Sequence, residues 1–118
     1  MARLPIMPVF TDALVGDTLH LSRDQFGAHM LILIATWRNN GQALPDDDRR
    51  MAHLTRATVK EWRTRLRPVL VEFFDISDGD WHQKRLEAEW ADAIQKSTKQ
   101  ATRSRRRWKQ PPDPFRRR

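Results

Sequence analysis

Residues 17–54 read DTLHLSRDQFGAHMLILIATWRNNGQALPDDDRRMAHL, and this stretch decides the fold class. Ser22 followed by Gln25 is a capping-box pattern, which marks the start of a helix. The segment 26–37 is almost wholly apolar, leaves no polar stripe and is too short to cross a bilayer. Asn-Asn-Gly at 39–41 supplies a stop signal. We therefore expect a helix that the rest of its own domain surrounds.

A short second helix is expected to begin at three consecutive carboxylates, Asp46, Asp47 and Asp48. Carboxylates stabilise a helix start because the helix dipole is positive at that end. The helix would run to about Leu54 and bury that residue together with Met51. A metal site is the weaker interpretation of the triplet, because consecutive carboxylates on a helix point in different directions.

The third helix is predicted to begin at Thr58, with Glu61 in the capping-box position. Pro68 interrupts it, because proline cannot donate the backbone hydrogen bond that its position needs. We expect a kink there, or a fresh helix that starts near Pro68. The apolar face of this segment follows helical spacing and consists of Val59, Trp62, Leu66, Val69, Leu70 and Phe73.

Beyond Phe74 the pattern changes to that of a β-hairpin, with Asp78–Gly79 as a favoured type I′ turn pair. A fourth helix should follow from about Gln83 and carry Leu86, Trp90 and Ile94 on its apolar side. The order helix, helix, helix, hairpin predicts a mainly α fold of the winged helix-turn-helix type, in which the hairpin is the wing. The short segment Thr18–Leu21 would supply the third strand and pair with the hairpin. We expect this domain to span residues 1–95.

The net charge of +7 arises in the C-terminal tail. From Lys96 onward there are ten basic residues and one acidic residue, whereas residues 1–95 carry twelve basic and fourteen acidic residues. A basic tail favours a polyanionic partner, and a solvated terminus that only keeps the protein soluble is the alternative. We expect the tail, 96–118, to be helical at first and then disordered, because three prolines preclude a regular helix: Pro111, Pro112 and Pro114.

Cations in two places are candidates for nucleic-acid binding. In a helix-turn-helix domain the helix that corresponds to the third one enters the major groove, where Arg and Lys reach guanine edges or phosphates. A charged, solvent-facing stripe without a binding role accounts for the same pattern about equally well. The candidates on this helix lie on one face and are Arg56, Lys60, Arg63 and Arg67. The tail would neutralise phosphates and stack an indole on a base or sugar through Arg103, Arg105, Arg106, Arg107, Trp108 and Lys109.

Catalytic, metal and cofactor roles find no support in the sequence. There is no cysteine, and the four histidines, His20, His29, His53 and His82, lack metal-ligand spacing. His29 lies in the apolar helix and is expected to be a core or boundary residue. We therefore expect a protein that is not an enzyme and that holds neither a metal nor a cofactor.

The expected partners follow from the same features. Duplex DNA comes first, a replication protein second, and a homodimer through the fourth helix is a further option because Trp90 could face a partner. Trp37 and Trp62 should lie in the core, whereas Trp81 could pack under the wing or contact DNA. Residues 1–10 are neither a signal peptide nor a membrane span, so no membrane partner is expected and the cytoplasm is the default compartment.

The run at 17–54 resembles the YdaU-like family of phage and prophage proteins. Its members typically show an Asp-Thr-x-His-Leu-Ser entry, an apolar helix ending in Trp, and then Leu-Pro-Asp-Asp-Asp. The resemblance continues in KEWRTRLRPVLVEFF at 60–74, DGDWHQKRLEAEW at 78–90 and RRRW at 105–108.

The function of the YdaU-like family is unassigned. The family is similar to the N-terminal winged-helix domains of phage replisome organisers and replication initiators, which implies binding to origin DNA in replication initiation or its control. The alternative is a protein-interaction adaptor of phage replication with a non-specific nucleic-acid-binding tail.

Overall fold

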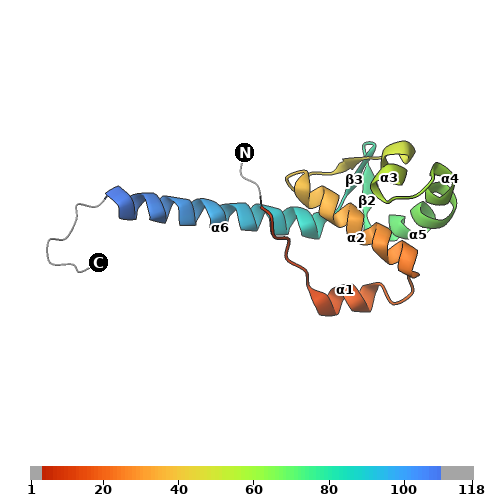
Figure 1. Cartoon of the computed structure of the whole chain (residues 1–118), viewed down its shortest axis with the longest axis horizontal. Coiled ribbons are helices and arrows are strands. Elements are labelled where there is room, and N and C mark those ends of the chain that lie inside the picture. The colour runs from red at the N-terminus through yellow and green to blue at the C-terminus, as the bar shows by residue number, and fades with distance from the viewer. Residues whose placement is uncertain (1–3, 110–118) are drawn as a thin grey trace.

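The structure is a computed structural model that describes residues 4–109, and of residues 104–109 it describes the helix backbone alone. Figure 1 shows a small body of helices and strands from which one long helix projects. The elements are α1 (Thr11–Asp17), α2 (Arg23–Arg38), β1 (Leu44–Pro45), α3 (Asp48–Leu54), α4 (Val59–Glu61), a π-helical turn (Trp62–Leu66), α5 (Arg67–Leu70), a 3-10 turn (Val71–Phe73), β2 (Asp75–Ser77), β3 (Asp80–His82) and α6 (Lys84–Lys109). The expectation of a mainly helical fold with a small antiparallel sheet is confirmed.

Both capping boxes predicted from the sequence are present. At the start of α2, the Ser22 backbone N–H donates to the Gln25 side chain over 2.9 Å and the Gln25 N–H donates to the Ser22 hydroxyl over 3.2 Å. Thr58 and Glu61 make the same exchange at the start of α4. These reciprocal bonds satisfy N–H groups that a helix start leaves without a partner, so the two boundaries can be read from local sequence.

The third helix is broken, as Pro68 predicts. A π-helical turn separates α4 from α5, and the Arg67 N–H donates to the Trp62 carbonyl five residues earlier. Pro68 lies in the first turn of α5 and has no N–H to donate to the preceding turn, and the π-helical hydrogen bond lies directly before it. The helix therefore restarts near the proline with its apolar face still turned to the core.

The sheet has the strand order β1–β3–β2, and both pairings are antiparallel. Asp78 and Gly79 join β2 to β3 with φ values of 54° and 75°, both positive as a type I′ turn requires. The prediction that Thr18–Leu21 supplies the third strand is wrong, because β1 pairs with β3 instead. Thr18–Leu21 forms a turn between α1 and α2, where the Leu21 N–H donates to the Thr18 carbonyl over 3.0 Å.

The core lies between α2, α3, the π-helical turn and β3. Trp62 and Trp81 are fully buried, and their ring centroids lie 5.5 Å apart. Ile32 packs in the same cluster. Trp37, also predicted to be a core residue, is buried and donates its indole N–H to the Leu4 carbonyl over 2.8 Å. Trp81 thus packs beneath the hairpin, which decides between the two roles considered for it.

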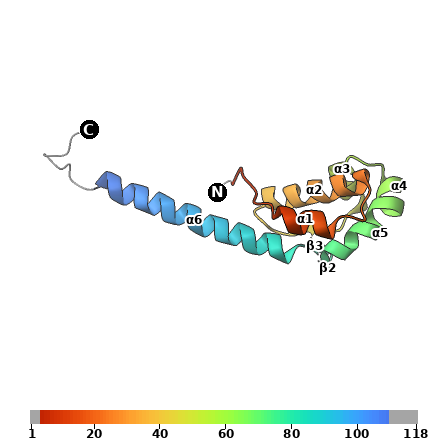
Figure 2. The same cartoon turned by 90° about the horizontal axis from the view of Figure 1, so that it is seen from below.

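The segment before α2 contains a helix that was not predicted. Helix α1 follows an extended N-terminal segment; it lies in front of α2 in the view of Figure 2, whereas Figure 1 shows it set apart below α2. Phe10 occupies its N-cap position and forms no side-chain cap, and none of its residues is fully buried. A helix without a capping residue or a strong apolar face leaves little local signal to predict it from.

Helix α6 continues well beyond the body, and the molecule measures 69 × 29 × 22 Å along its principal axes (Figure 1). A helix of 26 residues is about 39 Å long. The boundary expected between residues 95 and 96 falls inside this unbroken helix. The prolines Pro111, Pro112 and Pro114 lie outside the described residues. Within residues 4–109, no helix combines the length and the apolar character needed to cross a membrane.

Candidate nucleic-acid interface

The three consecutive carboxylates before α3 have different roles. Asp47 is the N-cap, and its side chain accepts from the backbone N–H groups of Arg49 and Arg50 over 3.0 and 3.4 Å. Asp48 lies in the first helical turn, where its charge suits the dipole. The predicted helix-start role is therefore confirmed for these two residues. Among residues 4–109, no group of three or more His, Asp or Glu side chains is placed to hold a metal ion.

Two of these carboxylates also bridge the core to the charged surface, which the sequence did not indicate. Asp46 accepts from the Trp81 indole over 2.8 Å and from Arg67 Nη2 over 3.0 Å. Asp48 accepts from the Trp62 indole over 3.0 Å and from Arg63 Nε over 2.8 Å. Each carboxylate thus joins one buried tryptophan to one arginine on the surface.

The pKa of Asp48 is lowered by this arrangement. The hydrogen bond from Arg63 is the largest cause, and the indole hydrogen bond and the charges of Arg63 and Arg67 act in the same direction. Partial burial opposes them by disfavouring the charged carboxylate. Asp48 is therefore an anion at neutral pH and holds its two donors as charge-assisted hydrogen-bond partners.

The predicted stripe of four cations on the third helix is wrong at its first member. Arg56 lies in the turn between α3 and α4, with a φ of 62°, because α3 ends at Leu54 and Thr58 caps the next helix. Lys60 lies in α4, Arg63 in the π-helical turn, and Arg67 begins α5. Of the four residues, three therefore share one helical segment and the fourth precedes it.

The three helical cations differ in their ion pairs and in how exposed their side chains are. Lys60 is exposed and forms no ion pair with any residue in the described part of the chain. The Arg63 side chain is paired with Asp48 yet 62% exposed. Arg67 is paired with Asp46, is only 36% exposed, and lies 5.9 Å above the Trp81 ring. Arg67 is therefore mainly a structural residue, whereas Lys60 and Arg63 remain accessible to a ligand.

The second candidate surface is the basic half of α6. Lys96 pairs with Asp92 over 3.0 Å, one helical turn away. Lys99 and Arg103 are exposed and pair with none of the residues that the structure describes. The remaining candidates of this group belong to the same helix backbone, but their side chains lie outside the described residues: Arg105, Arg106, Arg107, Trp108 and Lys109.

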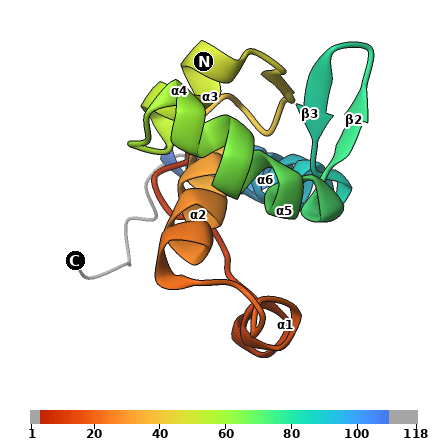
Figure 3. The same ribbon diagram turned by 90° about the vertical axis from the view of Figure 1, so that its right-hand side faces the viewer.

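The two surfaces lie at opposite ends of the molecule. Figure 1 shows α4 and α5 at one end and the far half of α6 at the other. The view from that first end, in Figure 3, shows α4 and α5 in front while α6 runs away behind the body. A single short stretch of nucleic acid in contact with α4 would not reach the far half of α6, so the surfaces would contact separate segments.

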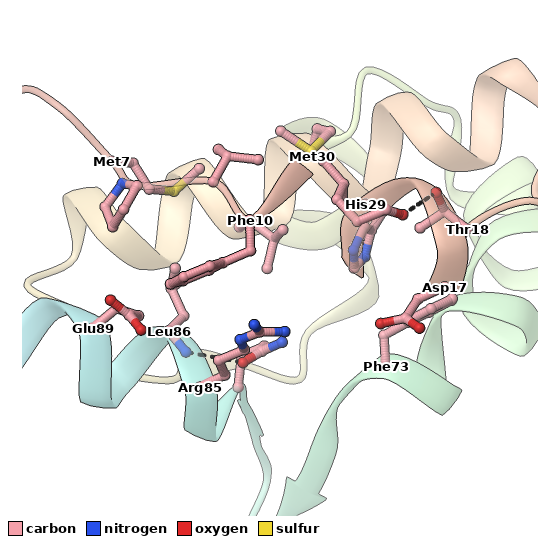
Figure 4. A pocket seen from close by; sticks show the side chains of 15 residues that line it. Met7, Phe10, Asp17, Thr18, His29, Met30, Phe73, Arg85, Leu86 and Glu89 are labelled. Atoms are coloured by element: carbon pink, nitrogen blue, oxygen red, sulfur yellow. Dashed lines mark hydrogen bonds between the residues drawn. The ribbon is translucent and has the colours of Figure 1, made fainter. Parts of the chain in front are cut away.

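A small pocket of about 110 Å³ lies where the N-terminal segment, α1, α2 and the start of α6 meet (Figure 4). His29 lines it and is 96% buried, and its ring lies 4.7 Å from that of Phe73. Its Nδ1 atom has no hydrogen-bond partner among the described residues. Burial lowers the pKa of His29 because it disfavours the charged imidazolium. The prediction of a core or boundary histidine is confirmed.

Beside the same pocket, Arg85 lies 4.5 Å above the Phe10 ring.

The fold and these surfaces define a class of protein: a small helical domain with a three-stranded sheet, extended by a basic helix. The chain belongs to the family described as "Protein of unknown function (DUF1376)", whose profile matches residues 5–91. It is similar to the "Uncharacterized protein YdaU" of Escherichia coli (strain K12), with 33% identity over 101 residues. That match covers 86% of this chain and 34% of the relative, so the chain spans about a third of the relative's length. No solved structure matches the chain.

Proposed function

We propose that the protein binds duplex DNA, through a body of the winged helix-turn-helix type and through the basic half of α6. The observation that carries this proposal is the exposed charge of Lys99 and Arg103, which pairs with no residue that the structure describes, on a helix that projects from the body. Phosphate contacts of this kind supply most of the affinity of non-specific DNA binding. The expected setting is phage or prophage replication initiation or its control, with a replication protein as a further partner.

The arrangement of the body supports the winged helix-turn-helix assignment. α3 and α4 are joined by a four-residue turn at 55–58, the usual length in a helix-turn-helix. The hairpin β2–β3 follows after α5 and the 3-10 turn and can serve as a wing. The recognition helix would be the segment from Val59 onward, whose N-terminal residues contact base edges in such domains. Lys60 and Arg63 lie in that part.

The proposal is tested by fluorescence anisotropy with the full-length protein, on labelled duplex and single-stranded DNA at several salt concentrations. If about six cations contact phosphates, the association constant should fall roughly as the fifth power of the salt concentration. A variant with Lys99→Gln and Arg103→Gln should bind more weakly, and its salt slope should be smaller by about two. The matched control removes two exposed cations from elsewhere, with Arg38→Gln and Lys84→Gln, and should retain the slope.

Three results would contradict the proposal. If wild-type protein does not bind duplex DNA even at low salt, the protein has another function. If the two double variants lose affinity equally, net charge and not the basic half of α6 determines binding. If the Lys60→Gln and Arg63→Gln variants bind every duplex as wild type does, the body is not a DNA-reading domain.

The second candidate is a protein-interaction adaptor with a non-specific nucleic-acid-binding tail. It is favoured by the pairing of Arg63 and Arg67, which reduces the positive charge of the body, and by large apolar side chains at its surface. Ile6 and Leu19 are 81% and 78% exposed. The adaptor predicts that binding depends on the basic half of α6 alone and does not distinguish duplex from single-stranded DNA.

A homodimer through α6 is the remaining partner option. Trp90, the residue expected to face a partner, is half-buried and packs against Gly41 of the same chain. A dimer contact on α6 would therefore have to use residues of the helix other than the part of Trp90 that Gly41 covers. Sedimentation velocity at several concentrations measures whether such a dimer forms.

A further inference from the structure

The guanidinium of Arg63 is held from one side only. Its Nε donates to Asp48 Oδ2 over 2.8 Å, whereas neither of its Nη groups donates to a residue that the structure describes. The side chain is 62% exposed. A guanidinium has a planar fork of donors, so a hydrogen bond at Nε restrains the side chain and leaves the two-Nη edge free.

The carboxylate that holds Arg63 is itself fixed from the core. Asp48 Oδ1 accepts from the indole Nε1 of Trp62 over 3.0 Å, and Trp62 is fully buried. One oxygen of Asp48 is thus tied to the most buried aromatic ring of the domain, and the other is tied to Arg63. Rotation of the carboxylate would break both bonds, so the orientation of Arg63 is set by the packing of the core.

The other arginines of this segment are held differently. Arg67 donates through Nη2 to Asp46, and Arg65 donates through Nη2 to Asp24 over 3.3 Å. In both, a donor of the Nη edge is already occupied. Within residues 59–70, therefore, Arg63 alone among the arginines is bonded through Nε with the opposite edge exposed.

We propose that Arg63 reads a guanine in the major groove through its two Nη groups and that Asp48 is its positioning residue. The O6 and N7 acceptors of guanine suit a bidentate arginine, and this contact is the commonest specific one in the major groove. The inference rests on the proposed binding of duplex DNA and adds a ligand class to it, a guanine-containing site. Holding the arginine in place beforehand reduces the conformational entropy that binding would otherwise cost.

The test compares the full-length wild type with Asp48→Asn. Asparagine keeps an oxygen that can accept from Trp62, but it places an NH₂ group where Arg63 needs an acceptor. The matched control is Asp24→Asn, which changes the net charge equally and removes the acceptor of Arg65 instead. Each protein is first used to select duplexes from a random library. Its affinity is then measured, at one salt concentration, for three duplexes: the selected site, the same site with its guanine replaced, and an unrelated duplex.

We expect the wild type and Asp24→Asn to prefer the guanine site over its substituted form by about tenfold or more. Asp48→Asn should lose about tenfold of this preference while it binds the unrelated duplex at least as well as the wild type, because a negative charge has been removed. Equal preference in Asp48→Asn and wild type would overturn the positioning role, although DNA binding itself would stand. Failure of the wild type to bind any duplex would overturn the proposed function and this inference together.

Arg63→Lys keeps the inference testable if Asp48→Asn is poorly folded. Lysine keeps the positive charge and leaves the Trp62–Asp48 bond in place, but it lacks the planar fork. It should lose the guanine preference and retain affinity for the unrelated duplex. An unchanged preference in Arg63→Lys would show that Arg63 contacts phosphate only.

Discussion

Gly41 lies directly against Trp90, so that a Cβ atom at position 41 would lie 2.7 Å from the Trp90 Cβ and 2.8 Å from its Cγ. Gly41 also has a φ of 72°, a conformation that glycine adopts without strain. The turn that ends α2 therefore contacts the beginning of α6 without a side chain between them. This contact attaches the projecting helix to the body.

Gly41→Ala is expected to be strongly destabilising. The left-handed conformation costs alanine about 1–2 kcal/mol, and the collision with Trp90 should add about 1–3 kcal/mol. The measurement is urea unfolding followed by tryptophan fluorescence. Gly79→Ala is the matched control, since Gly79 has a φ of 75° but no atom of the described residues lies within 4 Å of the added Cβ. Gly79→Ala should lower the free energy of unfolding only by the cost of the left-handed backbone conformation. An equal decrease for Gly41→Ala would contradict the close contact with Trp90.

Gly27→Ala is expected to stabilise the protein. Gly27 lies in the interior of α2, and an added Cβ would meet no atom of the described residues within 4 Å outside the neighbouring backbone of α2. Alanine is more favourable than glycine in a helix interior by about 0.5–1 kcal/mol. The midpoint of thermal unfolding should rise by a few degrees. A fall in the midpoint would mean that this side of α2 has no room for a methyl group.

Arg56→Gly should leave the stability equal to wild type or raise it by up to about 1 kcal/mol, because Arg56 has a φ of 62°. Arg56→Ala removes the same charge but keeps the unfavourable backbone conformation, so it should not gain stability. Chemical unfolding separates the two variants. In the DNA assay the two should weaken binding equally if the Arg56 charge contacts phosphate, and unequal loss would point to the turn conformation instead.

The stability of the fold should fall with decreasing pH in a window set by His29. Burial lowers the His29 pKa below its ordinary value of 6.5, so the unfolded chain binds a proton more readily than the folded one. The stabilising contribution is complete above pH 6.5 and is lost as the pH falls through the lower pKa of the folded state. His29→Leu should flatten this part of the profile of unfolding free energy against pH. If the slope of the unfolding free energy against pH is unchanged in His29→Leu, the pH dependence arises from another group.

Local sequence was sufficient for the starts of α2 and α4 and for the hairpin. The pairs Ser22–Gln25 and Thr58–Glu61 act across three residues, and Asp78–Gly79 specifies its turn by backbone preference alone. Pro68 likewise imposes its break through the N–H that it lacks. Such signals need no tertiary contact, so they could be predicted from neighbouring residues.

The third strand and the roles of the acidic residues could not be predicted in this way. β1 is defined by its pairing with β3, which brings Leu44 opposite Trp81, thirty-seven positions along the chain. Asp46 and Asp48 have the residue types of a helix start, and only folding places the indoles of Trp81 and Trp62 within hydrogen-bond distance of them. The same packing pairs Arg63 and Arg67 with these acids, which the charge pattern of one helix did not reveal.

The sequence by itself determined where α2, α3 and α4 begin, but not the presence of α1, and it showed that the positive charge is concentrated after Lys96. These properties depend on capping, apolar spacing and composition, all of which act over a few residues. Only the tertiary structure decided which cations are free and where they lie: Arg67 is held over Trp81, Lys60 is exposed, and the basic half of α6 points away from both. The availability of a charge depends on the side chains that surround it, and long-range packing of the core brings those side chains together.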